Sequence, residues 1–249
     1  MRKQLFILAA LWLAFCTGCS KDNAGASTPD GGKGGSMARF TIVGDHMYVV
    51  NTRKLKVYNV SNPQAPVFKN EVDLGWDIET IFPYGNNLFI GASSALYICS
   101  LADPANPKLE SRVGHFRSCD PVVATGQTAY VTLRSGGNCG GNQNVLAVYD
   151  VHSLTAPLLK QTISLNGPYG LGVEKNILYV CDGTSGLRVY DISSPWNPKH
   201  VYHVIGNREN NFHDVIPHRG VLIAQLADGV SFYDISQPER PTLLSTVKN

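Results

Sequence analysis

Side chains that could do acid–base chemistry stand just before several strand-like runs of this sequence. Asp77 and Glu79 precede one run, Asp120 precedes the next, and His213 precedes the last. Two carboxylates at a set separation can hydrolyse a glycosidic bond, with a histidine beside them as acid or base. The same side chains can also line a polar binding surface. The elements that position them therefore decide between catalysis and binding.

Five gapless ten-residue blocks organise the chain. Each block ends in proline, and the final prolines are spaced by 41, 50, 41 and 43 residues. The blocks are VYNVSNPQAP at 57–66, ICSLADPANP at 98–107, VYDVHSLTAP at 148–157, VYDISSPWNP at 189–198 and FYDISQPERP at 232–241. Self-similarity at a period of about 42 residues indicates a repeat architecture.

The blocks resemble the LVIVD repeat, whose strand ends in an aspartate followed by a Ser/Asn-Pro turn. Residues 189–193 and 232–236 match this pattern best. Ser100 replaces the aspartate in the second block, and Leu154 replaces the first proline in the third. The resemblance covers residues 38–249. It implies a propeller-like fold and a bacterial or archaeal surface protein, and it implies no particular activity.

Strand and turn signals within each repeat predict the same fold. The fourth unit has four strand-like runs separated by Asn, Gly and Pro clusters, at 169–173, 177–181, 187–192 and 199–204. Alternating apolar residues rich in Tyr, Val and Ile favour strands, and four antiparallel strands per repeat make a propeller blade. We expect an all-β, five-bladed β-propeller of four-stranded antiparallel blades over residues 38–249. Blade five should pack directly on blade one, and a six-bladed ring is the alternative.

One end of such a ring should gather the candidate residues. The loops leading into each innermost strand share that end with the loops between the second and third strands. We expect a ligand-binding face there, formed by Trp76, Asp77, Glu79, Arg117, Asp120, Tyr169, Asn211, Phe212 and His213. Glu79, Asp120, Tyr169 and His213 fall in one aligned column and should ring the axis. They either grip a polar ligand or only solvate the channel.

The third unit carries an insertion, SGGNCGGNQN at 135–144. A Gly/Asn-rich loop of this kind is exposed and flexible. It contains Cys139, and Cys119 lies in the loop leading into the same blade. We hypothesise a disulfide between these two residues, with two free thiols as the alternative. Cys99 and Cys181 fall in or at the end of predicted strands and should be buried.

The first 37 residues contain a targeting signal and a tether. Arg2 and Lys3 precede an apolar run from Leu5 to Phe15, which is too short to span a bilayer and matches a secretory signal. The next four residues, CTGC at 16–19, resemble the lipobox of bacterial lipoproteins, although cysteine stands where leucine is usual. The resemblance implies a signal peptide at 1–18 and a lipid on Cys19. A plain secretory signal is the alternative.

Residues 19–37 form a Gly/Ser-rich stretch that should behave as flexible coil. Its start, SKDN at 20–23, resembles the export signal of Bacteroidetes surface lipoproteins, and an ordinary polar tether is the equal alternative. We therefore expect an outer-membrane lipoprotein of the cell envelope, held to the membrane by its lipid anchor. Exposure at the cell surface depends on which interpretation of 20–23 is correct.

Charge and motif content exclude several classes. Loss of Arg2 and Lys3 with the signal leaves 19 basic against 19 acidic residues, whereas nucleic-acid binding requires a basic surplus or stripe. The four cysteines beyond residue 19 contain no CxxC pair, and no histidine ligand spacing, P-loop or dinucleotide fingerprint is present, so no metal, cofactor or nucleic-acid partner is expected.

The function expected from the sequence is that of a non-catalytic binding or scaffold module for a protein or carbohydrate, with no catalytic residue. The alternative is a glycoside hydrolase-like enzyme near the central channel. Its carboxylates would be Asp77, Glu79 and Asp120, with His213 as their partner.

Overall fold

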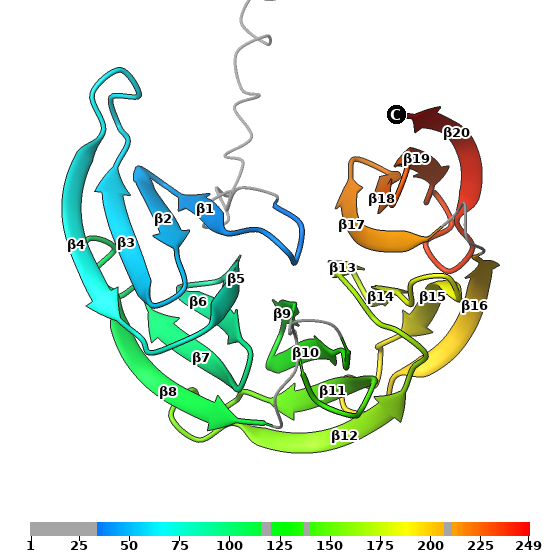
Figure 1. Ribbon diagram of the computed structural model, residues 1–249, viewed down its shortest axis with the longest axis horizontal. Coiled ribbons are helices and arrows are strands. Elements are labelled where there is room, and N and C mark those ends of the chain that lie inside the picture. Colours follow the sequence, from blue (N-terminus) through cyan, green and yellow to red (C-terminus); the bar gives the residue numbers. More distant parts are fainter. Residues whose placement is uncertain (1–33, 116–120, 137–139, 207–210) are drawn as a thin grey trace, which may run out of the picture.

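The computed structural model describes residues 34–115, 121–136, 140–206 and 211–249. These residues form twenty strands arranged as five four-stranded antiparallel sheets (Figure 1). Each sheet uses four consecutive strands, ordered from the innermost to the outermost, and so forms one blade. The chain is an all-β, five-bladed β-propeller, as the repeats predict.

The blades follow the repeats in order. Blade 1 comprises β1 (Phe40–Val43), β2 (His46–Val50), β3 (Lys54–Asn59) and β4 (Val67–Asp73), and blade 2 comprises β5 (Ile78–Tyr84), β6 (Asn87–Ala92), β7 (Ala95–Ser100) and β8 (Lys108–Gly114). Blade 3 comprises β9 (Val122–Thr125), β10 (Thr128–Leu133), β11 (Val145–Asp150) and β12 (Leu158–Ser164). Blade 4 comprises β13 (Leu171–Glu174), β14 (Ile177–Cys181), β15 (Gly186–Asp191) and β16 (Lys199–Ile205), and blade 5 comprises β17 (Phe212–His218), β18 (Val221–Leu226), β19 (Gly229–Asp234) and β20 (Thr242–Lys248).

The repeat aspartate shapes the turn after each third strand. Asp191 accepts a hydrogen bond from the Ser193 N–H at 2.8 Å, and the aspartates of the third and fifth blocks make the same contact. Such side-chain bonds two residues along the chain mimic a backbone turn. In blade 2 the hydroxyl of Ser100 accepts from the Ala102 N–H at 3.2 Å. The turn therefore survives the loss of the aspartate in that block.

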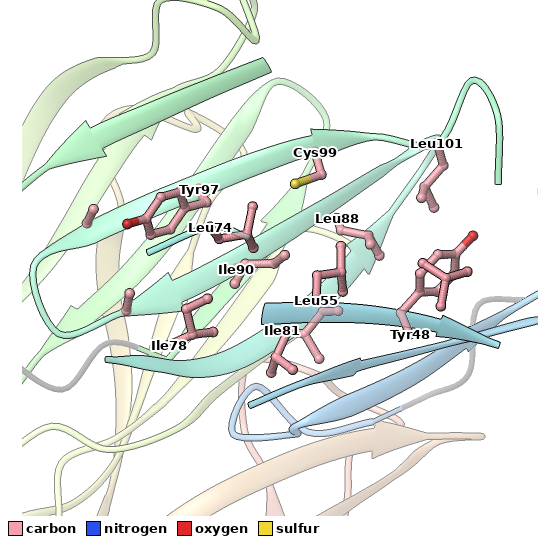
Figure 2. Packing of buried hydrophobic residues seen from close by; sticks show 14 residues of the cluster. Tyr48, Leu55, Leu74, Ile78, Ile81, Leu88, Ile90, Tyr97, Cys99 and Leu101 are labelled. Atoms are coloured by element: carbon pink, nitrogen blue, oxygen red, sulfur yellow. The ribbon is translucent and has the colours of Figure 1, made fainter. Parts of the chain in front are cut away.

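The hydrophobic core lies between successive blades. Between blades 1 and 2, Tyr48 and Leu55 pack with Leu88 and Ile90 in one buried cluster (Figure 2). Equivalent clusters join blade 2 to 3, blade 3 to 4 and blade 4 to 5. Because each blade has two apolar faces, only its neighbours can cover both. This arrangement explains why one short sequence motif recurs throughout the fold.

Three of these four interfaces share a hydrogen bond. The tyrosine hydroxyl of one second strand donates to the carbonyl of the first proline in the next blade. The pairs are Tyr48–Pro104 at 2.8 Å, Tyr130–Pro195 at 2.9 Å and Tyr179–Pro238 at 2.8 Å. The remaining interface has Phe89 at the tyrosine position and Leu154 at the proline position, and the two residues belong to the same apolar cluster. The two departures from the repeat thus occur together.

The expected packing of blade 5 directly on blade 1 is wrong. Figure 1 shows a ring that stays open between these blades, and among the described residues each buried cluster joins one of the other four pairs. Blade 5 carries Ile223 and exposed Gln225 where earlier blades have a buried aromatic ring and a buried small or apolar residue. The side of blade 5 that faces blade 1 therefore lacks the buried residues with which each earlier blade packs against the next one.

The end of the predicted tether belongs to the fold. Ser36 is only 1% exposed, and its hydroxyl donates to the Asp214 carboxylate at 3.1 Å and accepts from the Leu171 N–H at 2.8 Å. The Ala38 carbonyl accepts from the Ile81 N–H at 2.9 Å. Residues 36–38 thus connect the innermost strands of blades 2, 4 and 5.

Candidate ligand-binding face

Two adjoining pockets lie on the loop face, defined here as the end of the ring that holds the loops leading into the innermost strands. A pocket of about 250 Å³ is lined by Arg134, Ser135, Asn144, Asn166, Gly167, Tyr169, Asp182, Gly183, Thr184, Ser185 and Asn211. A second pocket, of about 280 Å³, is lined by Met37, Arg39, Glu79, Thr80, Pro121, Arg134, Pro168 and Tyr169. We call them the blade-4 pocket and the channel pocket. Because both share Arg134 and Tyr169, they form one continuous surface.

Arg134 and Tyr169, which the two pockets share, form a stack of planar side chains with His213. The Arg134 guanidinium carbon lies 4.1 Å from the centre of the Tyr169 ring, and the Tyr169 and His213 rings are stacked with centroids 4.6 Å apart. Burial, together with the positive charge of Arg134, lowers the pKa of His213. Its imidazole is therefore neutral at pH 7, and Arg134 supplies the positive charge of the stack.

A buried carboxylate builds the blade-4 pocket. The Asp182 side chain is fully buried, and its Oδ1 accepts hydrogen bonds from the N–H groups of Asn166 and Gly167 at 2.9 and 2.8 Å. Its Oδ2 accepts from the Arg188 Nε at 2.6 Å. These bonds fix the loop leading into blade 4 against the turn after β14. Because both oxygens of the Asp182 carboxylate are hydrogen-bonded, this buried side chain holds the wall of the pocket in place.

Amide side chains complete the wall. The Asn144 Oδ1 accepts from the Ser135 N–H at 2.8 Å, and its Nδ2 donates to the Asn166 carbonyl at 2.7 Å. Both ends of the described insertion are thereby tied to blade 4. In the same pocket the buried Oδ1 of Asn211 has no hydrogen-bond partner among the described residues. Buried acceptors are normally paired, so this oxygen is an exception in the wall of the pocket.

The structure brings four of the predicted residues together. Tyr169 and His213 stack, Glu79 lines the channel pocket with Tyr169, and Asn211 lines the blade-4 pocket with Tyr169. The Arg39 guanidinium, beside Glu79, donates to backbone carbonyls at the start of blade 2. These positions agree with loops of several blades meeting at one end of the ring.

Trp76 and Asp77 lie outside both pockets. Trp76 is 69% exposed, and the Arg53 guanidinium lies 4.6 Å from the centre of its ring. The Asp77 Oδ2 accepts from the Ser93 hydroxyl at 3.2 Å. Both residues belong to the boundary between blades 1 and 2.

Phe212 requires a correction. Its ring is fully buried and packs against Tyr233 in the cluster between blades 4 and 5. It is the first residue of β17, and the alternation of the strand turns it into the core while its neighbour His213 faces the stack. Phe212 is therefore a core residue and does not line the loop face.

Several predicted residues lie outside the described part of the chain. They are Cys19, Arg117, Cys119, Asp120 and Cys139. Cys99 and Cys181 are free and fully buried, as expected.

Sequence reasoning missed Arg134. It directly follows β10 and precedes the insertion, and this position was the available signal. Asp182 was harder to interpret, because a turn aspartate gives no sign in sequence that it will be buried.

Within the described residues, no group of His, Cys, Asp or Glu could hold a metal ion. The described part of the chain also contains no helix long and apolar enough to cross a membrane.

Comparison with protein families matches residues 34–74 and 170–204 to the LVIVD repeat. A search of curated proteins found no match.

Solved structures resemble the fold at low sequence identity. A protein of unknown function from Desulfotomaculum acetoxidans shares 15% identity at a TM-score of 0.64, over 83% of this chain and 67% of that one. The periplasmic gluconolactonase PpgL of Pseudomonas aeruginosa shares 15% identity at 0.62, over 82% and 68%. The computationally designed protein Ika8 shares 11% identity at 0.61, over 84% of this chain and only 60% of its own length. These likenesses show the fold of the molecule, a β-propeller, and two of its regions match the LVIVD repeat.

Proposed function

We propose that this protein is a non-catalytic binding module of the cell envelope, anchored through a lipid on Cys19, and that its loop face binds a carbohydrate. The observation that carries the proposal is the Arg134–Tyr169–His213 stack, flanked by hydrogen-bonding loops. Polar ligands are recognised by aromatic surface combined with a few fixed donors and acceptors. The blade-4 pocket offers this combination, because the Tyr169 ring stands beside the polar side chains of Arg134, Asn144 and Asn166.

The carboxylates favour binding over hydrolysis. Among the described residues that line the two pockets, the only carboxylates are Glu79 and Asp182. Asp182 already accepts three hydrogen bonds, one of them from its ion-pair partner Arg188. Glycoside hydrolysis needs two carboxyl groups facing the same bond, one of them free to exchange a proton. Asp182 is therefore unsuited to the second role.

The test uses the mature chain on an array of bacterial and host glycans, followed by calorimetry with the best ligand. Arg134→Ala and Tyr169→Ala should each weaken binding at least about tenfold, a loss of about 1.4 kcal/mol. The matched control is Trp196→Ala. Trp196 forms a comparable cation–π pair with Lys160, 4.2 Å from the ring centre, at the proline-turn end of the ring. Its loss should leave affinity unchanged.

Three results would contradict the proposal. They are the absence of any bound glycan, turnover of a bound glycan by the wild-type chain, and equal losses of affinity in Trp196→Ala and Arg134→Ala.

A further inference from the structure

At the opening of the ring, blade 5 and blade 1 each expose one face. The equivalent faces of the other blades are buried against a neighbouring blade. In blades 1 to 4, three positions on the second and third strands are buried against the next blade. These are Tyr48, Leu55 and Val57; Phe89, Leu96 and Ile98; Tyr130, Leu146 and Val148; and Tyr179, Leu187 and Val189, all at most 1% exposed. Their counterparts in blade 5, Ile223, Val230 and Phe232, are partly exposed.

The facing side of blade 1 is uncovered as well. Phe40 and Ile42 are 58% and 40% exposed, and their cross-strand partners Val49 and Met47 are partly exposed. In blade 2, Leu88 and Ile90 occupy the positions of Met47 and Val49 and are completely buried. Blade 1 thus presents the half-interface that a preceding blade normally covers.

The two faces are complementary halves of an interface that the molecule makes four times. A pocket of about 320 Å³ lies on the blade 5 side, lined in part by Ile216, Ile223 and Val230. A single sheet between the blades would repeat the established packing on both of its sides. In Figure 1 the five blades run most of the way round the axis, so the opening has no place for the five sheets of a second copy.

We propose that the opening between blade 5 and blade 1 receives one four-stranded antiparallel β-sheet from a separate polypeptide, which acts as a sixth blade. This interaction uses the facing sides of blades 5 and 1 and not the two loop-face pockets, although His213 of the stack also lines the pocket on the blade 5 side. The incoming sheet would present aliphatic and aromatic side chains to Val230 and Phe232. Its opposite face would meet Met47 and Val49, with an acidic group opposite Lys56, which replaces the Tyr97 of blade 2 at the edge of this surface.

The test uses a probe whose two faces each pack on a neighbouring blade within this fold. A synthetic polypeptide with the sequence of residues 165–205, which is blade 4 with its lead-in loop, is added to the mature chain. Hydrogen exchange should then slow in β1, β2, β18 and β19. Phe232→Asp should weaken binding at least tenfold. Leu243→Asp, on the exposed outer strand β20, should leave it unchanged.

A fused form, with the same segment joined after Asn249, raises the effective concentration of the probe. Protection in either format that disappears in Phe232→Asp supports the proposal. Absence of protection in both formats overturns it. Sedimentation of the native chain as a dimer that Phe232→Asp dissociates would also overturn it, because a second copy would then cover the faces.

Discussion

The hydroxyl of Ser36 donates a hydrogen bond of 3.1 Å to the carboxylate of Asp214, and so joins the N-terminal segment to the innermost strand of blade 5. The same carboxylate accepts from the N–H groups of Met37 at 3.4 Å and Val215 at 3.0 Å. Blade 5 does not pack on blade 1, so this contact links the two ends of the open ring. Desolvation raises the pKa of Asp214 to about 6 despite these hydrogen bonds.

The first prediction concerns pH. An aspartate in an unfolded chain titrates near pH 3.9, so the fold binds the Asp214 proton more tightly than the unfolded chain does. The stabilisation from this group is complete below about pH 4 and is lost as the pH rises through about 6. The loss should reach at most about 3 kcal/mol, since one pKa unit corresponds to about 1.4 kcal/mol.

Urea unfolding of wild type and Asp214→Asn between pH 4 and 7 measures this contribution. Burial lowers the pKa values of His200 and His213, so protonation of these two side chains destabilises the fold as the pH falls through the same range. The difference between the two proteins isolates Asp214. Wild type should lose stability relative to Asp214→Asn as the pH rises, and a constant difference would contradict the assignment.

The second prediction compares two glycines of one loop. A Cβ on Gly170 would lie 2.1 Å from the Asp214 Oδ1 and 2.9 Å from the His213 carbonyl oxygen, whereas a Cβ on Gly167 would meet nothing within 4 Å. Gly170→Ala should therefore lower the free energy of unfolding by about 1–3 kcal/mol, the usual cost of overpacking. Gly167→Ala should change it by less than about 0.5 kcal/mol. Thermal and urea unfolding provide the measurement, and similar effects from both variants would show that the loop is placed differently.

The third prediction concerns the tyrosine hydroxyls between blades. Tyr130→Phe leaves the Pro195 carbonyl without its donor and should cost about 1 kcal/mol. Tyr48→Phe and Tyr179→Phe should behave alike. Phe89→Tyr should bring no comparable gain, because the next blade has Leu154 where the proline would be. Urea unfolding curves decide the matter, and a stabilisation by Phe89→Tyr of the same size would refute this account of the interface.

The fourth prediction concerns thiols. Burial raises the pKa of Cys99 to about 12 and that of Cys181 well above its ordinary value. Both should resist iodoacetamide in the folded protein and react after unfolding, because the thiolate is the nucleophile. A peptide map with and without reduction measures the labelling of these two thiols and also tests the hypothesised Cys119–Cys139 disulfide. Rapid labelling of Cys99 in the native state would mean that the interface between blades 1 and 2 opens readily.

The fold was predictable because the repeat imposes the same packing problem five times. The spacing of the final prolines located every blade, and the strand and turn signals of the fourth unit located its four strands. The open ring was not foreseen, since Ile223 looks like one more apolar residue in the tyrosine column. Whether Ile223 is buried depends on whether another blade covers it, and the sequence of one strand does not contain this information.

The candidate site was predictable only in part. Alignment of the loops brought Tyr169 and His213 together correctly, because equivalent positions of a ring face the same axis. The prediction that Phe212 lines the loop face was wrong, because the register of β17 decides which of two adjacent aromatic residues points into the core. Arg134 was missed because its role depends on the distant Tyr169 ring, and only the folded chain brings the two into contact.

The most direct test of the proposed function is hydrogen exchange of the mature chain with and without a glycan selected on the array. Slowed exchange confined to residues 135–136, 140–144, 166–169 and 182–185 is the predicted result, since these loops line the blade-4 pocket. Protection of the proline turns at the opposite end, with these loops unchanged, would contradict binding at the loop face.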